Sequence, residues 1–429
     1  MNWESLQMKI SMLTLGCKVN QYEAECIASQ LRDAGHEVVE TMEPADAYVL
    51  STCAVTNEAE RKSRQMLAKL RKLNPNAKII VCGCASQHNS QQFASKPNVS
   101  ITVGTSGKQW IVDLLNQKGD YTMEPTTDYE SFGCPTVHHT RAFVKIQDGC
   151  DNYCSYCLIP YLRGHCRSRP LQDVVVECFD LSHKTKEIVL TGINLSAWGR
   201  DIGLSLADVL SSLSNLPTRI RLSSMEMNIV DKTLLGVMEK MPNLCEHFHL
   251  SVQSACNRTL KDMNRHYTIE EFMSVVDKLR HAFPTCAITT DLIIGYPTET
   301  EEDFEQTLKN VEKIGFADMH LFPYSRREGT VAARLPMLDS DVVKDRVARM
   351  TALRDKLKQQ YLIKQRGLNY EVLLEEKVDG LWVGHARNFV KTYVDCDKYN
   401  VKPNDIIIAR VGDVFADGVR ADFVTKMED

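Results

Sequence analysis

Apolar runs of strand length alternate with amphipathic runs of helical length over residues 8–119. The runs MKISMLTL, AYVLST and AKIIVC predict strands, and helices are expected at Gln21–Ala34 and Glu58–Leu73. Asn74-Pro75 is a stop signal for the second helix. Strands and helices in this order predict a parallel sheet that is covered by helices on both faces.

The same alternation resumes at Arg141 after a polar, aperiodic stretch at residues 120–136, which we interpret as a linker. Six strands are expected in the runs RAFVKIQ, EIVLTG, RIRLSS, HFHLSV, CAITTDLIIG and DMHLFPYS. Helices are expected between them at Leu171–Ser182, Ser205–Leu213, Lys232–Met241, Thr268–Ala282 and Glu301–Ile314. Repeated units of this kind predict a partial or complete βα barrel with its active site at the carboxyl ends of the strands.

The last segment contains short strand-like runs with turns at Asp379-Gly380 and Asp417-Gly418, which predicts a small antiparallel β-barrel of OB-like size. We therefore expect an α/β protein of three domains. A flavodoxin-like parallel sheet occupies residues 8–119, a partial βα barrel residues 137–366, and the small barrel residues 367–429.

Composition fits a soluble globular protein, with 43% hydrophobic and 25% charged residues among 429. The N-terminus has no basic start followed by a long apolar run, so we expect no secretory signal. No stretch reaches the apolar length of a membrane span. Fifteen cysteines then favour metal chemistry in a reducing cytosol over a disulfide framework, which predicts a cytoplasmic protein.

The run GCDNYCSYC spaces Cys150, Cys154 and Cys157 as CxxxCxxC. A structural zinc site uses four ligands, and a cubane iron–sulfur cluster has four corners. Three cysteines therefore leave one iron open for chemistry. This spacing resembles the signature of radical S-adenosylmethionine (SAM) enzymes.

A second group of three cysteines is expected in the first domain. Cys17, Cys53 and Cys84 each come just after a predicted strand, and the carboxyl ends of parallel strands gather ligands at one edge of a sheet. Cys82 lies inside its apolar strand, whereas Cys84 follows Gly83 into the turn, so we choose Cys84. The sequence therefore predicts a second three-thiolate site.

Polar residues also follow the strands of the predicted barrel. Any one of them is explained by a helix cap or a loop hydrogen bond, but together they line one rim. These residues are Gly192, Asn194, Ser224, Glu226, Gln253, Asp291, Tyr324 and Ser325.

The runs TLGCKVNQYE, STCAVTNEAERKSRQ, VCGCASQ and QDGCDNYCSYCLIPYLRG resemble the radical SAM methylthiotransferase family, and the resemblance covers essentially the whole chain. It implies two 4Fe–4S clusters, one held by Cys150, Cys154 and Cys157 and an auxiliary one held by Cys17, Cys53 and Cys84. It also implies a C-terminal TRAM domain. Tyr156 is expected to lie against the adenine of SAM, with Gly192, Asn194, Ser224, Glu226, Gln253 and Asp291 around the cofactor.

Within the family, CDNYCSYC followed by IPY is most similar to the branch that acts on threonylcarbamoyladenosine in tRNA. The implied reaction inserts a methylthio group at carbon 2 of that base, beside the anticodon, and uses two SAM molecules per turnover. One SAM supplies the methyl group and the other the radical. Methylthiolation of isopentenyladenosine in tRNA, or of an aspartate in a ribosomal protein, is the alternative.

The resemblance further implies three kinds of partner: the anticodon arm of tRNA, an electron donor of the reduced flavodoxin or ferredoxin type, and a sulfur donor. Residues 61–72 carry six basic groups and no acid, and residues 341–366 have a surplus of five basic groups. Such segments favour contact with a polyanion, although either is also explained by a solvated helix face. We expect tRNA contacts from Arg61, Lys62, Arg64, Arg163 and Arg167.

A more distant alternative is a non-enzymatic iron–sulfur or zinc protein that binds RNA. It requires both cysteine groups to be structural, with Cys134, His165 or Cys166 as a fourth ligand beside Cys150–Cys157. No second cysteine pair stands at zinc-like spacing, which disfavours it. We assign no family role to Cys166 and interpret it as a bystander thiol.

Overall fold

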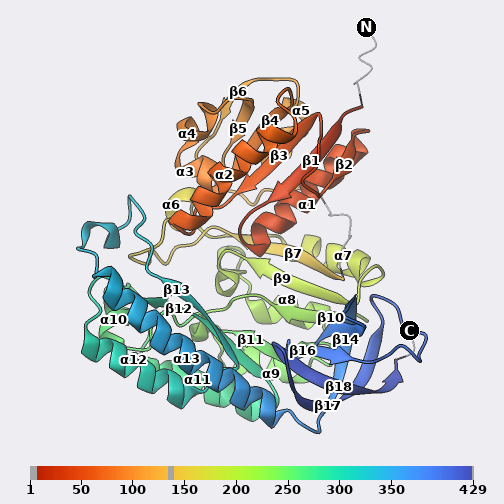
Figure 1. The fold of residues 1–429 in the computed structure, drawn as a ribbon, viewed down its shortest axis with the longest axis vertical. Coiled ribbons are helices and arrows are strands. Elements are labelled where there is room, and N and C mark those ends of the chain that lie inside the picture. Colours follow the sequence, from red (N-terminus) through yellow and green to blue (C-terminus); the bar gives the residue numbers. More distant parts are fainter. Residues whose placement is uncertain (1–6, 134–139, 428–429) are drawn as a thin grey trace.

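The expected N-terminal sheet has six parallel strands in the computed structural model, which describes residues 7–133 and 140–427 (Figure 1). Their order is β2-β1-β3-β4-β5-β6, which contains the flavodoxin-like order 2-1-3-4-5. The strands are β1 (Lys9–Thr14), β2 (Glu37–Val39), β3 (Ala47–Thr52), β4 (Lys78–Gly83), β5 (Val99–Val103) and β6 (Gly119–Tyr121). The helices beside them are α1 (Lys18–Asp33), α2 (Asn57–Leu73), α3 (Cys84–His88), α4 (Ser90–Ala94) and α5 (Ile111–Leu114), with a 3-10 turn η1 (Lys108–Trp110).

Each face of this sheet buries its own apolar cluster. Ile10, Ile27 and Ile80 lie in one cluster, whereas Leu50 and Leu67 lie in the other. Two-sided burial explains why AYVLST is apolar without alternation, since all six residues of β3 are buried. Thr56 accepts a hydrogen bond from the amide of Ala59 (3.1 Å) and so caps the start of α2.

The central segment forms the expected partial barrel. Its strands pair as β10-β9-β7-β8 and β11-β12-β13, and isolated parallel bridges join β10 to β11. The strands are β7 (Arg141–Asp148), β8 (Arg167–Ser168), β9 (Glu187–Gly192), β10 (Arg219–Leu222), β11 (His247–His249), β12 (Ala287–Ile294) and β13 (Asp318–Pro323). The helices are α6 (Ile159–Arg163), α7 (Leu171–Ser182), α8 (Leu206–Leu213), α9 (Lys232–Lys240), α10 (Asn257–Asp262), α11 (Ile269–Ala282), α12 (Glu301–Ile314) and α13 (Ser340–Lys364). Short 3-10 turns are η2 (Leu195–Ala197), η3 (Arg200–Ile202), η4 (Met227–Ile229) and η5 (Ala332–Arg334).

The C-terminal segment is a closed five-stranded barrel in the order β14-β15-β16-β18-β17. Its strands are β14 (Asn369–Val378), β15 (Leu381–Ala386), β16 (Lys391–Val394), β17 (Ile406–Phe415) and β18 (Gly418–Lys426). The prediction of a purely antiparallel barrel is wrong, because β16 and β18 run parallel. A closed ring with an odd number of strands cannot alternate direction throughout, so at least one parallel pair is required.

The structure also bears on the expected boundaries. β6 ends at Tyr121, so ordered sheet extends into the stretch that was expected to be a linker. The expected start of the second domain at residue 137 lies outside the described residues, and so does Cys134. None of the described helices is long and apolar enough to cross a membrane.

Candidate active site

Cys17, Cys53 and Cys84 meet at the carboxyl edge of the N-terminal sheet. Cys17 caps the start of α1 after β1, Cys53 follows β3, and Cys84 opens α3 after β4. These three strands are neighbours, and the first two flank the point where the strand order reverses. A methyl group added at Gly16 (φ +118°) would lie 2.9 Å from the Cβ of Cys53, so the loops approach closely only because residue 16 is glycine.

The thiol of Cys82 is directed elsewhere. Cys82 pairs with Ser51 inside the sheet and is fully buried in the apolar cluster that contains Ile80 and Ile101. Cys84 packs on the opposite side with Leu158 and Leu162, which come from the second cysteine segment. The geometry therefore favours Cys84 as the member of the group.

A buried guanidinium covers this group. Arg163 at the end of α6 is completely buried, and its Nε donates to the Sγ of Cys84 (3.4 Å). Its other nitrogens donate to Asp148 (3.0 Å), Glu23 (3.0 Å) and Asn20 (2.8 Å). Asp148 in turn accepts from the amide of Gly149 (2.7 Å), the residue before Cys150. One side chain thus connects the two cysteine segments.

The charges around Arg163 do not balance. The buried network contains four cations and only two carboxylates, a surplus of two positive charges: Lys108, Lys145, Arg163 and Arg167 against Glu23 and Asp148. Burial raises the pKa of Cys53 to about 12 and also raises that of Cys17, so empty thiols are neutral here. Thiolates bound to a metal would supply the missing negative charge. The residues present therefore fit an anionic iron–sulfur group.

The second group lies in the loop between β7 and α6. Gly149 has φ +72°, and a methyl group there would collide with the carbonyl oxygen of His165 at 1.9 Å. The amide of Cys150 donates to the carbonyl oxygen of Gly164 (3.0 Å), and that of Cys157 to the carbonyl oxygen of Cys154 (3.0 Å). Burial, with a smaller contribution from the neighbouring Cys154, raises the pKa of Cys150 to about 11 and that of Cys157 to about 12.

Each thiol of this loop has a hydrogen-bond donor. Arg265 Nη1 lies 3.3 Å from the Sγ of Cys154, Asn194 Nδ2 lies 3.9 Å from that of Cys150, and the amide of Ile159 lies 3.4 Å from that of Cys157. Such donors stabilise sulfur that carries negative charge, so this group also fits an iron–sulfur cluster. Sequence reasoning missed Arg265, and the only signal for it was its place in the run KDMNRHYT.

Several expected rim residues join this loop. Glu226 accepts from Asn152 Nδ2 (2.7 Å) within the loop and lies 3.0 Å from Arg265 Nη2. The amide of Asn194 donates to Gln147 Oε1 (2.7 Å). A methyl group at Gly192 would lie 3.0 Å from the Cβ of Gln147, so a larger residue there would have to displace Gln147 slightly.

The remaining rim residues lie on either side of the loop. Gln253 has φ +63°, a backbone conformation rare outside glycine, and its amide donates to the carbonyl oxygen of Asp291 (2.9 Å). Tyr156 packs beside Tyr296 and Tyr324 and is near Arg265. Ser224 and Asp291 instead line a separate cavity.

That cavity has a volume of about 340 Å³ and is lined by residues of all three domains. Lys18 enters from α1, directly after Cys17, and Phe389 enters from the loop between β15 and β16. His249, Asp291 and His320 line its barrel side, with their potential ligand atoms within 4.8 Å of one another. His249 Nε2 lies 3.2 Å from Asp291 Oδ2 but is not aligned for a hydrogen bond.

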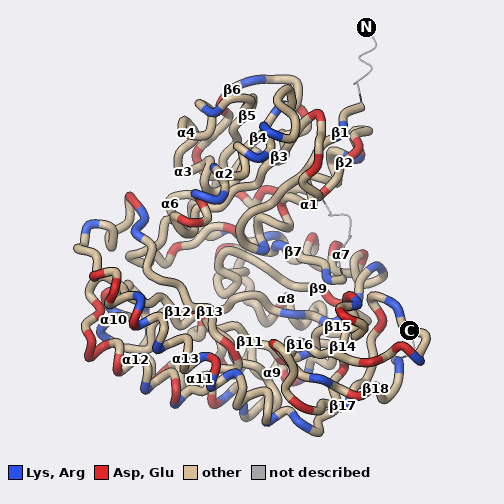
Figure 2. Tube along the Cα trace, viewed as in Figure 1, with Lys and Arg blue, Asp and Glu red and all other residues tan. Residues whose placement is uncertain are grey.

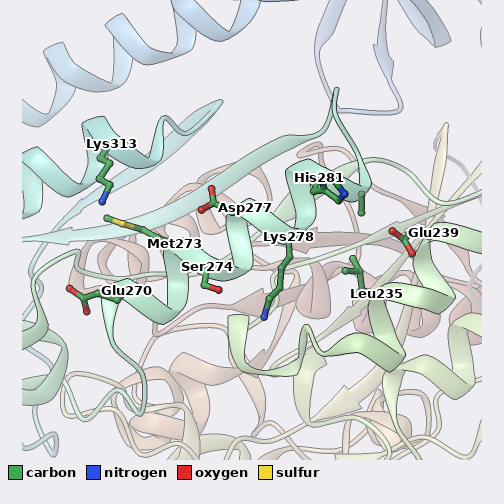
Figure 3. Close-up of a pocket in the computed structure, with 10 residues that line it drawn as sticks. Leu235, Glu239, Glu270, Met273, Ser274, Asp277, Lys278, His281 and Lys313 are labelled. Atoms are coloured by element: carbon green, nitrogen blue, oxygen red, sulfur yellow. The ribbon is translucent and has the colours of Figure 1, made fainter.

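A larger hollow of about 560 Å³ lies on the outer face of the barrel (Figure 3). Its lining comes from helices α9, α11 and α12 only and includes Glu239, Lys278 and His281. None of the cysteines or rim residues discussed above lines it. We therefore place the chemistry at the strand ends and not in this hollow.

The expected tRNA contacts need correction. Arg163 is completely buried and Arg167 is 4% exposed, because both serve the buried ion network, so neither is available to a surface ligand. Arg61 and Lys62 are exposed on α2, although both lie near Glu58. Arg64 is half-buried between Glu60 and Gln92.

The basic surplus of residues 341–366 is also neutralised in the fold. Helix α13 lies beside α12, and its cations pair mainly with acids there and on nearby elements (Figure 2). Arg349 reaches Glu301, Lys356 reaches Glu312, and Lys358 reaches Asp318. The expectation of a basic tRNA-binding face on this helix is therefore not met.

The zinc alternative finds little support. His165 pairs with Asp151 at 2.6 Å and is exposed, and Cys166 donates to the carbonyl oxygen of Gly149 (3.8 Å). Within residues 7–133 and 140–427, the one group of three side chains close enough to hold a single ion is His249, Asp291 and His320. In the described residues neither cysteine group has its three sulfur atoms close enough together for one ion.

Known proteins share this chain's sequence over most of its length. Residues 9–104 match the Uncharacterized protein family UPF0004, and residues 144–311 match the Radical SAM superfamily. The chain is 36% identical over 402 residues to threonylcarbamoyladenosine tRNA methylthiotransferase MtaB of Bacillus subtilis (strain 168), and 89% of each chain is covered. The chain belongs to the radical SAM methylthiotransferase family. As a radical SAM methylthiotransferase it uses a 4Fe–4S cluster and SAM.

Other methylthiotransferases are also similar. MtaB of Thermotoga maritima is 41% identical over 331 residues, which cover 75% of this chain and 76% of that one. A tRNA-2-methylthio-N(6)-dimethylallyladenosine synthase of Thermoanaerobacter sp. (strain X514) is 35% identical over 381 residues, covering 84% and 81%.

A solved structure shares the fold. The radical SAM methyltransferase TsrM from Kitasatospora setae, with cobalamin and a [4Fe–4S] cluster bound, superposes with a TM-score of 0.57 at 12% identity. The match covers 88% of this chain and 81% of that one. The similarity confirms the predicted combination of a parallel sheet domain and a radical SAM barrel.

Proposed function

We propose that this methylthiotransferase inserts a methylthio group at carbon 2 of N6-threonylcarbamoyladenosine, beside the anticodon of tRNA. Two relatives that carry this activity in their names are 36% and 41% identical to the chain. The observation that carries the proposal is the pair of cysteine groups connected through Arg163, Asp148 and Gly149. Such an arrangement suits a reaction that needs two metal centres close together.

In this proposal Cys150, Cys154 and Cys157 hold the radical SAM cluster, while Cys17, Cys53 and Cys84 hold an auxiliary 4Fe–4S cluster. With SAM bound, the first cluster supplies radical chemistry for an unreactive carbon. Arg265, Asn194 and the amide of Ile159 stabilise its thiolates. Arg163 does the same for Cys84 and keeps water away from it.

Two SAM molecules are consumed in each turnover, one for the methyl group and one for the radical. We place SAM against Tyr156 and the rim residues that surround the loop. The contacts of Glu226 and Asn194 with the cluster loop support this position. The set proposed for SAM is Tyr156, Gly192, Asn194, Glu226 and Gln253. Ser224 and Asp291, which were also expected around SAM, line the separate cavity instead.

We place the anticodon arm across α2 and the C-terminal barrel. Lys69, Arg71 and Lys72 are exposed on the last turns of α2, and no ion pair with a described carboxylate engages them. They add to Arg61, Lys62 and Arg64, the contacts expected earlier on the same helix. An electron donor of the flavodoxin or ferredoxin type and a sulfur donor complete the set of partners.

A reducing, cytoplasmic location suits this chemistry. All fourteen cysteines within the described residues are free thiols. Disulfides are rare in the cytosol, whereas thiolate-bound clusters persist there.

The test compares tRNA from cells with and without this protein by nucleoside mass spectrometry. The proposal predicts loss of 2-methylthio-N6-threonylcarbamoyladenosine and accumulation of its precursor. Loss of the methylthiolated isopentenyl base from tRNA, or of a methylthiolated aspartate in peptide mass spectra of the ribosomal proteins, would show that the alternative substrate is correct.

A companion measurement tests the two centres. Anaerobic reconstitution should give about eight irons per chain, from two cubanes. Replacing Cys17, Cys53 and Cys84 by Ala should remove about half of the iron and abolish methylthiolation, while reductive SAM cleavage continues. Loss of all iron in this variant would contradict independent sites.

A further inference from the structure

The cavity between the three domains contains one lysine that forms no ion pair with a described carboxylate. Lys358 pairs with Asp318 (2.7 Å), and Lys391 pairs with Asp417 (3.1 Å). Lys18, the third lysine of the lining, forms no ion pair with any carboxylate in the described parts of the chain. Around Lys18 the positive charges of Arg221 and Arg141 outweigh the carboxylates of Asp291 and Glu187. The lining is therefore a binding point for an anionic group.

Two histidines of the same lining, His249 and His320, have ring nitrogens without a hydrogen-bond partner among the residues that the structure describes. His320 is exposed to the cavity, and its ring lies 5.8 Å from that of His249, measured between centroids. His249 Nδ1 is engaged with Thr289 Oγ1 (3.0 Å), so its Nε2 is directed toward Asp291. No described residue forms a hydrogen bond with a ring nitrogen of His320.

An aromatic platform closes the other side. Phe389 is 41% exposed, although its ring stacks on His247 and His385 with centroids 5.0 and 4.6 Å away. Its backbone has φ +65°, a strained conformation for a bulky residue. Asn388 Nδ2 donates to Tyr370 Oη (3.0 Å) and so anchors the loop. Strain that the surroundings maintain in this way is typical of ligand sites.

The cavity lies where the N6 substituent of the reacting adenine would be expected. Lys18 directly follows Cys17, and Ser224 lies two residues before Glu226, which contacts the radical SAM loop. Carbon 2 and the N6 substituent of an adenine lie on either side of N1. A base whose carbon 2 faces both cysteine groups can therefore extend its N6 substituent into this cavity.

We propose that the cavity binds the threonylcarbamoyl group of the substrate, with Lys18 holding its carboxylate, His320 its hydroxyl, and Phe389 covering its apolar side. This assignment rests on the proposed function and identifies the residues that select the substrate. A volume of about 340 Å³ lies within the range of small-molecule sites. An isopentenyl group would leave Lys18 and His320 without partners, and sites of this kind reject such analogues strongly.

The test removes the charge from each side of the contact in turn, first from Lys18 and then from the substrate. The reconstituted enzyme is assayed on an anticodon stem-loop RNA that carries threonylcarbamoyladenosine, and on the same RNA with the carboxylate replaced by a carboxamide. Lys18→Met should lower kcat/KM on the carboxylate RNA roughly 10- to 150-fold, the usual effect of losing a charge-assisted hydrogen bond. On the carboxamide RNA, Lys18→Met and the unaltered enzyme should differ less than about threefold.

Two further variants exclude indirect effects. His320→Phe should also lose activity on the carboxylate RNA and gain relative activity on isopentenyladenosine RNA. Lys240→Met, an exposed lysine on α9 outside the cavity, is the matched control and should behave like the unaltered enzyme. Iron content and RNA-independent SAM cleavage should be unchanged in all three variants.

Distinct results overturn the proposal. Equal losses of Lys18→Met on both RNAs would show that Lys18 serves the adjacent Cys17 instead. A stoichiometric divalent metal besides iron, lost in His320→Phe, would make the histidines metal ligands. If the unaltered enzyme methylthiolates only isopentenyl RNA, the proposed function itself fails; if it accepts carboxylate and carboxamide equally, only the cavity assignment fails.

Discussion

Arg163 is the residue whose role the fold changes most. In the sequence it belongs to a basic run, RGHCRSR, and predicts a surface contact with tRNA. In the structure Glu23 and Asn20, about 140 positions earlier, surround its guanidinium. Contacts at such separation leave no local pattern, so sequence reasoning identified the charge of Arg163 but not its partners.

The cysteines behaved differently because their environment is local. Each cysteine of the N-terminal group comes within three residues of the end of a strand, and apolar runs locate strand ends well. The choice of Cys84 over Cys82 rested on one glycine between them, and the geometry favours it. No pattern around Arg265 or Lys18 indicates a role. Arg265 contacts Cys154, and Lys18 lines the cavity, only because distant segments of the chain are brought together in the fold.

Replacing Arg163 by Met should selectively impair the auxiliary cluster that we propose at Cys17, Cys53 and Cys84. The change leaves Glu23 and Asp148 with one cation fewer, and breaking a buried ion pair costs about 3–5 kcal/mol. We expect a lower Tm, loss of up to half of the iron, and a more negative potential for any auxiliary cluster that remains. Thermal unfolding, iron analysis and redox titration measure these effects.

Arg163→Lys keeps the charge but not the forked geometry, so its losses should be intermediate. Arg200→Met, at an exposed position of the same segment, serves as the control. An unchanged iron content and potential in Arg163→Met would contradict the role that we assign to the guanidinium.

At the scale of elements, periodicity located the long helices well. α7 at Leu171–Ser182 and α12 at Glu301–Ile314 have the expected bounds. The short helices α3, α4 and α10 were not predicted, because five or six residues contain too little of a helical repeat. Net charge was the weaker guide, since a count of cations along α13 does not reveal the acids of α12 beside it.

Helix α2 should therefore contribute more to tRNA binding than α13 does. Replacing Lys69, Arg71 and Lys72 together by Gln removes three exposed cations and should weaken binding. The slope of log K against log salt should fall by roughly two to three if each cation contacts a phosphate. Filter binding of the anticodon stem-loop at several salt concentrations provides the measurement.

The matched control alters Lys344, Arg354 and Lys356 on α13, each of which already pairs with a nearby acid. This triple variant should bind nearly as the unaltered protein does. The reverse ranking of the two variants would place the tRNA on α13 and restore the original expectation from charge.

At the scale of the whole molecule, Glu187 holds the barrel and the C-terminal domain together. It is fully buried on β9 and pairs with Arg141 and Arg221 (both 2.7 Å) and with Arg219 (3.6 Å). Arg219 also reaches Glu371 on the C-terminal barrel (2.8 Å). The hydrophobic pattern predicted the two domains. It could not predict the contact between Arg219 and Glu371, because the pattern of one strand says nothing about which distant strand it will meet.

Glu187→Gln should destabilise the protein by about 3–5 kcal/mol, since the buried Arg219 and Arg221 and the half-buried Arg141 lose a counter-charge. Limited proteolysis should then cut faster between α13 and β14, and a lower Tm should accompany it. Glu239→Gln, at an exposed position of α9, is the control. Equal proteolysis of both variants would show that apolar packing alone holds the domain.

The same carboxylate predicts a dependence on pH. Burial alone would raise the pKa of Glu187, but Arg221, Arg141 and Arg219 outweigh it and hold that pKa well below the usual 4.5. A depressed pKa stabilises the fold above about pH 4.5 and loses that contribution as the pH falls further. Denaturant titrations should show stability falling below pH 4.5 less steeply in Glu187→Gln than in the unaltered protein.

The ion pairs of Glu23 constrain the order in which this protein folds during its synthesis. Glu23 is buried on α1, and two of its cations, Lys145 and Arg163, belong to the barrel segment. At a synthesis rate of about 5–20 residues per second, Arg163 is made roughly 3 to 11 seconds after Lys108, the partner within the first domain. During that interval the nascent sheet carries a carboxylate that it cannot yet bury. In the proposed function, iron and sulfur are therefore expected to reach the first three cysteines after the chain has grown past α6.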